Sequence, residues 1–292
     1  MIISVIVLRR ETVHKTASNR NQWLEAYDYI VVGAGAAGSV VAHRLSENCN
    51  NKVLLLEAGG PQSITTDIPK MSRSLLNSEY DWKYSTVPQN WVSPYRIPQA
   101  RGKGLGGSTT INNMVYNRGN RRDFDNWVTT FGAKGWAYRD LLPYFVNSEN
   151  NTDDSIVNGN PGFHGTAGPV TISSNPYPDP ILLLYQKTLY DYGIPSTDIN
   201  GRQQLGTAIA QSFIGNGLRS STANAYLEPN LKPDYLHILT NAYVTKVLFT
   251  KINGRLIASG VEFVKNGKKY SVKALREVIL SAGMLSSFKG SF

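Results

Sequence analysis

The stretch YDYIVVGAGAAG occupies residues 27–38, and KVLLLE follows at residues 52–57. The apolar run that ends at Val32 predicts a buried strand, and small and apolar residues recur at helical spacing over residues 36–45. KVLLLE predicts a second buried strand. A strand, a helix and a strand within about thirty residues form a βαβ unit, which requires a parallel sheet.

Three glycines in the first stretch, Gly33, Gly35 and Gly38, fit the pattern G-x-G-x-x-G. This pattern indicates dinucleotide binding only where it follows a strand and opens a helix, and both conditions are predicted here. Gly33 then permits the tight turn, Gly35 lets the backbone approach a pyrophosphate, and Gly38 lets helix and strand pack closely. The helix N-terminus offers unpaired N–H groups and about half a positive charge to the phosphates. The less favoured alternative is a helix packed on a strand through small residues.

Glu57 ends the second predicted strand. A carboxylate at this position accepts hydrogen bonds from the ribose hydroxyls of a dinucleotide. It would repel a 2′-phosphate, which disfavours NADP. These residues do not choose between NAD and FAD.

A second glycine-rich stretch, RGKGLGGSTT, spans residues 101–110. It also contains G-x-G-x-x-G, but no strand and helix flank it as the motif requires. It is not a Walker A loop, because Lys103 is followed by Gly104 and not by Ser or Thr. From the residues alone, a backbone that closes around a ligand and a surface loop with several tight turns are equally favoured.

The remaining pattern predicts helices over residues 122–131, 139–147 and 181–192, and strands over residues 236–249, 256–264, 269–272 and 277–281. Asn253-Gly254 and Asn266-Gly267 predict hairpin turns between these strands. Residues 59–100 and 147–169 show little periodicity and predict loops.

The chain has 292 residues, of which 41% are hydrophobic and 17% charged, a globular rather than a disordered composition. No apolar run approaches the ~20 residues of a membrane span. The net charge is +9, but the cations are scattered, so a solvated basic surface is favoured over a site for nucleic acid or acidic membranes. The single cysteine, Cys49, excludes an intrachain disulfide. The apolar residues 1–8 precede their charges and lack a nearby cleavage site, so they form a poor signal peptide.

Residues 101–119, RGKGLGGSTTINNMVYNRG, closely resemble the first signature of the glucose–methanol–choline (GMC) oxidoreductases, above all the insect glucose-dehydrogenase-like branch. The resemblance runs from Tyr27 to Ser287. Supporting stretches are KVLLLEAGG (52–60), GNRRDFDNW (119–127), FHGTAGP (163–169), DING (198–201), RSSTANAYL (219–227) and GVEF (260–263).

The resemblance implies FAD as the cofactor. In the family, the segment that matches residues 108–115 runs beside the flavin and the pyrophosphate, and the strand after Asn241 holds the adenine through the backbone of Val244. We therefore expect residues 101–115 to fold back over the first glycine motif and line one crevice. The FAD contacts predicted from both glycine motifs and the resemblance are Gly33, Gly35, Ala36, Ala37, Gly38, Glu57, Ala58, Arg101, Gly104, Leu105, Gly107, Ser108, Asn112, Asn113, Met114, Val115 and Val244.

The sequence departs from the family pattern at three positions. Ile111 stands where some members attach FAD through a histidine, which implies non-covalent FAD. Gly104 replaces a hydrophobic residue that is usual in the first signature. The segment 282–287 begins like the second signature, but Ser287 stands where a proline is expected.

The resemblance places the catalytic histidine beyond Phe292. None of the four histidines, His14, His43, His164 and His237, matches the family's catalytic position. We therefore predict no catalytic residue within the chain, and no metal site.

The expected fold class is α/β. A Rossmann-like FAD/NAD(P)-binding domain with a parallel sheet and a β-meander covers residues 27–150 and 217–287, and residues 151–216 form part of a second, substrate-binding domain. Residues 1–26 are an N-terminal extension.

The implied function is FAD-dependent oxidation of the CH–OH group of a sugar or alcohol, in a chain that is a fragment of the family fold. A non-catalytic FAD-binding remnant and an FAD-containing non-redox lyase are the alternatives. The implied partners are a sugar or alcohol substrate and either a quinone or oxygen as electron acceptor, with no nucleic acid. An extracellular location is an expectation from the resemblance alone.

Overall fold

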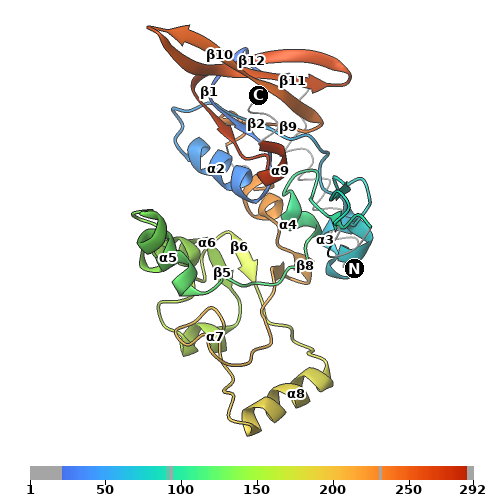
Figure 1. The fold of residues 1–292 in the computed structure, drawn as a ribbon, viewed down its shortest axis with the longest axis vertical. Coiled ribbons are helices and arrows are strands. Elements are labelled where there is room, and N and C mark those ends of the chain that lie inside the picture. The colour runs from blue at the N-terminus through green and yellow to red at the C-terminus, as the bar shows by residue number, and fades with distance from the viewer. Residues whose placement is uncertain (1–21, 90, 92–94, 230–231, 288–292) are drawn as a thin grey trace. The chain divides into compact units, whose positions relative to one another are not determined.

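The computed structural model describes residues 22–89, 91, 95–229 and 232–287 (Figure 1). The chain separates into two compact units: the first comprises residues up to Asn113 and from Ser221 onward, and the second is Met114–Ser220. Residues 114–150 therefore group with residues 151–220, whereas the sequence placed them in the dinucleotide-binding domain. The expected N-terminal extension lies mostly outside the described residues.

A six-stranded sheet forms the centre of the first unit, with strand order β10-β11-β12-β1-β2-β9. β1 (Ala26–Val32), β2 (Val53–Leu56) and β9 (Leu236–Leu239) are parallel neighbours. The predicted helix between β1 and β2 is α2 (Ala36–Glu47), and it covers the face of the sheet that the meander leaves free (Figure 1). The structure thus confirms the βαβ unit and the α/β class.

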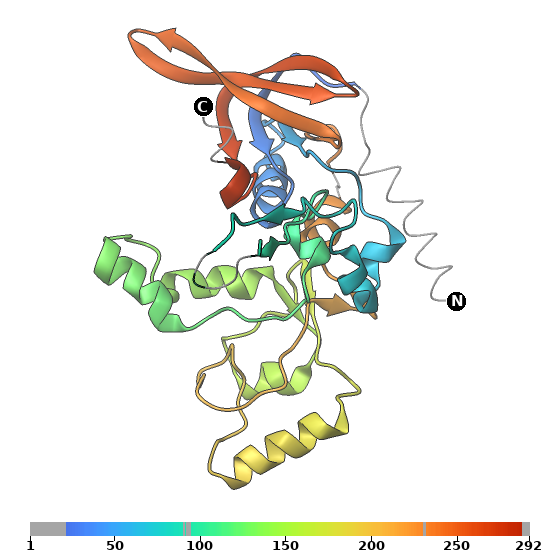
Figure 2. The same cartoon turned by 45° about the vertical axis from the view of Figure 1, so that its right-hand side comes forward.

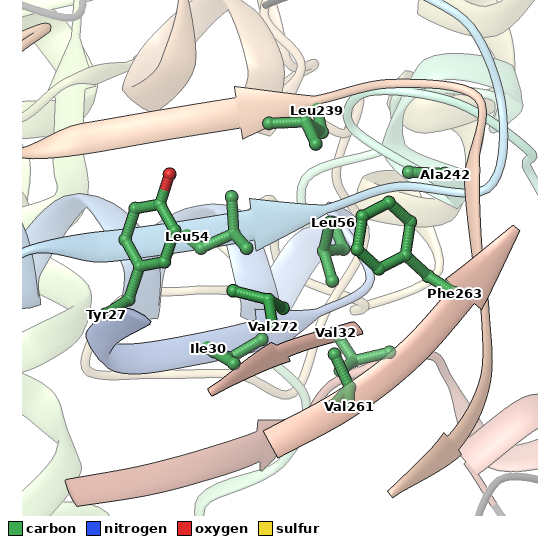
Figure 3. Close-up of a cluster of buried hydrophobic side chains, with 10 residues drawn as sticks. All are labelled: Tyr27, Ile30, Val32, Leu54, Leu56, Leu239, Ala242, Val261, Phe263 and Val272. Atoms are coloured by element: carbon green, nitrogen blue, oxygen red, sulfur yellow. The ribbon is translucent and has the colours of Figure 1, made fainter. Parts of the chain in front are cut away.

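Alternate residues of the parallel strands enter two different cores, because successive side chains of a strand point to opposite faces. Ile30 and Leu54 pack with Val261 and Phe263 of β11 in one core. Figure 3 shows the Phe263 ring beside Leu56 in this core. Val31 and Leu55 point the other way, toward α2. Burial on both faces explains why β1 and β2 are continuous apolar runs.

The antiparallel part of the sheet is the predicted meander of β10 (Ala242–Ile252), β11 (Arg255–Lys265) and β12 (Lys268–Leu280). Both Asn-Gly turns have positive φ at both residues, as a type I′ turn requires. Two strand predictions were wrong in extent. The predicted strand over residues 236–249 breaks at Asn241, whose φ is +52°. The strands predicted over residues 269–272 and 277–281 are one strand, β12, which ends at Leu280.

β12 joins the two halves of the sheet. Its first half pairs antiparallel with β11 from Lys268 to Lys273, and its second half pairs parallel with β1 up to Leu280. Trp23, in the predicted extension, also belongs to the fold, since its ring lies 5.3 Å from that of Phe263. Short elements complete this unit: α3 (Ile64–Asp67), η1 (Pro69–Leu75), β3 (Tyr84–Ser85), β4 (Pro98–Gln99), α4 (Ser108–Ile111), the π-helical turn η2 (Ala223–Leu227) and α9 (Met284–Ser287).

The second unit contains the three predicted helices, as α5 (Arg121–Phe131), α6 (Tyr138–Ser148) and α8 (Pro180–Asp191). A further helix, α7 (Asp154–Gly159), lies in a predicted loop. Asp153 caps its N-terminus, since the Asp153 side chain accepts hydrogen bonds from the N–H groups of Ser155 and Ile156. Short strands complete the unit: β5 (Glu149–Asn151), β6 (Val170–Ile172), β7 (Ile214–Gly215) and β8 (Leu218–Arg219). Among the described residues, no helix is both long and apolar enough to span a bilayer.

The interior of the second unit is held by a buried polar cluster. The His164 ring donates through Nδ1 to Glu149 at 2.8 Å and through Nε2 to Asp198 at 2.7 Å. Arg118 forms an ion pair with the other oxygen of Glu149. Both ring nitrogens face carboxylates, so the ring is an imidazolium. Burial lowers the pKa of His164, but the bonds to Asp198 and Glu149 outweigh it and raise that pKa to about 9.

Candidate dinucleotide-binding site

The turn between β1 and α2 is built from glycines for steric reasons. Gly33 has a φ of +96°, and a Cβ on it would lie 2.7 Å from the Ala282 Cα. A Cβ on Gly38 would lie 1.9 Å from the Gly33 carbonyl oxygen. Gly35 precedes the first helical residue and brings no side chain to cap the helix. The first N–H groups of α2, which have no partner within the helix, therefore donate no hydrogen bond to a capping side chain at residue 35.

Glu57 directly follows β2 and ties the site together. One of its carboxylate oxygens accepts from the Ala34 N–H at 2.8 Å. The other accepts from Gly59 at 2.8 Å and from Gly104 at 3.1 Å. Burial raises the pKa of this carboxyl, and the three N–H donors and Lys103 act against that rise. Glu57 thus holds the first glycine turn, its own strand end and the second glycine-rich segment in one arrangement.

The second glycine-rich segment lies directly against the first. The Gly106 N–H donates to the Ala34 carbonyl at 2.8 Å, and the Leu105 N–H donates to Gly60 at 3.1 Å. A Cβ on Gly107 would lie 2.7 Å from the Gly35 Cα. The structure therefore confirms, for residues 101–113, that this segment folds back over the first motif. The structure also shows a one-turn helix, α4, within this segment, which was not predicted from the sequence.

A cavity of about 510 Å³ opens beside these two segments. Val32, Leu56 and Leu280, the last residues of β1, β2 and β12, line its floor. It therefore lies at the carboxyl ends of three parallel strands, next to β1, where the sheet order reverses direction. This is where open α/β sheets bind their ligands, and the volume is in the ~300–1,000 Å³ range of small-molecule sites.

Many of the predicted contact residues line this cavity: Gly33, Gly35, Ala36, Ala37, Glu57, Ala58, Arg101, Gly107, Ser108 and Val244. Gly38, Gly104 and Leu105 lie behind the lining, where they shape the turn, hold Glu57 and fill the core under α2. Asn112 and Asn113 are exposed and do not border the cavity. Met114 and Val115 fall in the second unit, so their role stays a prediction.

Three aromatic side chains that line the cavity, Trp82, Tyr84 and Tyr243, were not predicted from the sequence, and we call them the aromatic wall. Trp82 stacks on Tyr84 with ring centroids 5.8 Å apart, and its ring lies 6.2 Å from that of Tyr243. The Lys103 ammonium lies 5.0 Å from the centre of the Trp82 ring. Trp82 and Tyr84 belong to the segment that shows no periodicity, so no local signal pointed to them. Residues 281–287, after β12, close another side.

None of the histidines that the structure describes lines the cavity. His43 lies on α2 against the Tyr226 ring. The Nδ1 of His237 is 2.7 Å from the Tyr27 hydroxyl, in the core. His164 belongs to the polar cluster of the second unit, and His14 lies outside the described residues. The described chain also contains no group of three or more His, Cys, Asp or Glu suited to a metal ion.

The residues present fit a dinucleotide. Gly33, Gly35 and Gly107 line the cavity with bare backbone, which a pyrophosphate can approach closely. The α2 N-terminus, Arg101 and the Ser108 hydroxyl offer positive charge and donors to a pyrophosphate. The backbone of Val244 and the ring of Tyr243 offer a flat edge for a base.

Fold and site together define a Rossmann-like, dinucleotide-binding α/β protein. Residues 27–289 match the GMC oxidoreductase family, and the chain belongs to it. It is 39% identical over 266 residues to glucose dehydrogenase [FAD, quinone] of Drosophila melanogaster, covering 89% of this chain and 42% of that protein. It is 39% identical over 268 residues to the oxygen-dependent choline dehydrogenase of Staphylococcus xylosus, covering 90% and 46%.

Solved structures give the same result. The crystal structure of pyridoxine 4-oxidase from Mesorbium loti superposes with a TM-score of 0.80 at 31% identity, over 89% of this chain and 50% of that one. The chain thus spans half or less of the length of these relatives. The sequence interpretation of family and fold is confirmed.

Proposed function

We propose that this chain is the FAD-binding portion of a flavoenzyme that oxidises the CH–OH group of a sugar or alcohol. The observation that carries this is the backbone contact between the two glycine-rich segments, at the carboxyl ends of β1 and β2. Residues outside the βαβ unit, among them Arg101, Gly107 and Ser108, thereby line the same cavity as the first glycine motif, as a cofactor with a second ring system needs. The family relatives named above support FAD rather than NAD.

Each part of the site has a separate task. The α2 N-terminus and Ser108 bind the pyrophosphate, and Glu57 fixes the glycine segments and faces the ribose. Val244 and the aromatic wall around Trp82 orient the adenine end. When bound, FAD supplies the group that accepts a hydride from the substrate. The direct contact of Gly107 with Gly35 closes one side of the cavity and would limit the access of water to a bound cofactor.

The electron acceptor that we propose is a quinone or oxygen, as the names of the two relatives above indicate for those proteins. One observation favours a non-catalytic FAD-binding form as the second candidate: none of the described histidines borders the cavity. A substrate alcohol would need a general base there, an effect worth about two to four orders of magnitude in rate.

The proposal is tested by titrating FAD into the purified chain and following the quenching of flavin fluorescence, with NAD and NADP as competitors. We expect saturable FAD binding that neither nicotinamide cofactor displaces. Displacement by NAD at comparable concentrations would contradict the assignment to FAD.

A further inference from the structure

The β10–β11 hairpin extends beyond the rest of the sheet. β12 pairs with β11 only from Gly260 to Lys265, so residues 255–259 of β11 have β10 as their single neighbour. We call residues 248–260 the hairpin arm. Figure 2 shows the arm reaching past the other strands. It takes no part in the cavity described above.

The arm carries large apolar side chains on both of its faces. The register pairs Lys251 with Leu256 and Ile252 with Arg255. Since paired residues share a face, Leu256 and Phe249 lie on one face and Ile252 and Ile257 on the other. Leu256 is 74% exposed and Phe249 58%. A hairpin in water normally keeps at least one face polar.

All the charged side chains of the hairpin arm are positive. Residues 235–261 contain no Asp or Glu, while Lys251 and Arg255 stand at the tip, one on each face. No ion pair joins either cation to a described carboxylate. Lys273 is exposed at the base of the arm, where it pairs with Gly260. The apolar tip thus carries two cations and no carboxylate, with a third cation at the base of the arm.

We propose that the hairpin arm is a membrane-surface anchor that inserts tip-first into the headgroup region of an anionic bilayer. A protein partner or a second copy would cover one face of the arm and leave the other in water. A lipid interface surrounds the tip and accepts both apolar faces at once. Lys251 and Arg255 then reach anionic headgroups while their aliphatic stems stay in the apolar layer.

The test is flotation of the 292-residue chain with vesicles of phosphatidylcholine alone or with 30% phosphatidylserine (roughly one anionic lipid in three). One variant, Lys251→Gln with Arg255→Gln, removes the charges, and another, Phe249→Ser with Leu256→Ser, removes the apolar tip. The matched control is Leu184→Ser with Tyr185→Ser on α8. That helix also exposes apolar side chains, but its Lys187 is paired with Asp191. Circular dichroism and melting temperature establish that each variant folds.

We expect the unaltered chain to float with the anionic vesicles only, and less so as salt is raised. Removing the two charges should weaken binding roughly ten- to thirtyfold, and removing the apolar tip by about tenfold or more. The α8 control should bind like the parent. Binding that ignores lipid charge, binding lost in the α8 control but kept in the arm variants, or no binding at all would overturn the proposal. So would vesicle-free self-association, measured by sedimentation, that the arm variants abolish.

Discussion

The backbones of Gly107 and Gly35 touch: a Cβ built on Gly107 would lie 2.7 Å from the Gly35 Cα. Gly107 combines a φ of +51° with a ψ of −133°, which lies outside the left-handed helical region and strains any residue with a side chain. This contact closes the second glycine-rich segment on the dinucleotide turn, and it depends on both residues having no side chain.

Gly107→Ala should therefore destabilise the first unit by about 3 kcal/mol or more, because backbone strain and a backbone clash add. It should also abolish FAD binding. The control is Gly60→Ala in the same layer, where a Cβ would meet only the Asn241 side chain at 3.8 Å. Denaturant unfolding and flavin fluorescence measure both effects. Equal stability of the two variants would show that the segments separate more easily than the structure indicates.

Glu57→Gln should cost about 2–3 kcal/mol, because an amide offers one acceptor oxygen where three N–H groups now bind a carboxylate. FAD affinity should fall as well, since the glycine segments lose their common acceptor. Glu277→Gln, at an exposed carboxyl on β12, is the matched control and should change neither quantity. An unaltered melting temperature for Glu57→Gln would contradict the role given to this residue.

The second unit should lose stability as the pH rises. The pKa of His164 is raised to about 9 from an ordinary 6.5, so its contribution is fully present below about pH 6.5 and is lost as the pH passes through about 9. The loss should reach at most about 3 kcal/mol. In His164→Gln this dependence should disappear, which urea unfolding at several pH values can measure. Parallel curves for parent and variant would show that the ring is not charged.

FAD should be bound non-covalently. Ile111 is buried in the short helix α4, does not border the cavity and has no nucleophilic atom. Acid precipitation of the FAD-loaded chain should therefore release the yellow colour into the supernatant. Colour that stays with the precipitate would mean that another side chain attaches the flavin.

The 292-residue chain, made as written and loaded with FAD, should not reduce dyes with glucose or simple alcohols. The reason is that no described histidine reaches the cavity. The comparison is a fusion to the C-terminal half of a relative, assayed with the same substrates. Turnover by the short chain at the rate of the fusion would place a catalytic base among the described residues.

Local patterns predicted the parts of the fold that local physics determines. The βαβ unit follows from apolar runs and a glycine turn, and the two Asn-Gly turns follow from their backbone preferences. The position of Glu57 follows from the same spacing. These features depend on residues close together in the chain.

Other features depend on contacts between distant residues. The break between β9 and β10 at Asn241 contains no glycine or proline that would mark it in the sequence. The sequence pattern predicted two strands within β12, because the two halves of β12 pair with different strands, β11 and β1. Trp82 lines the cavity through its contact with Tyr243 on β10, which is 161 positions later in the chain. The resemblance to the family placed Asn112 and Asn113 at the cofactor, but in the first unit they are exposed and do not border the cavity.

The position of β12 has a consequence for synthesis on the ribosome. Ala26 of β1 pairs with Lys273, so one side of β1 has no partner until the residues of β12 have been translated. At about 5–20 residues per second, the roughly 250 intervening residues take on the order of ten to fifty seconds. During that interval, the apolar strand Tyr29–Val32 has a bare edge, a template for pairing with other nascent chains. We expect the nascent protein to need a holding chaperone until β12 emerges.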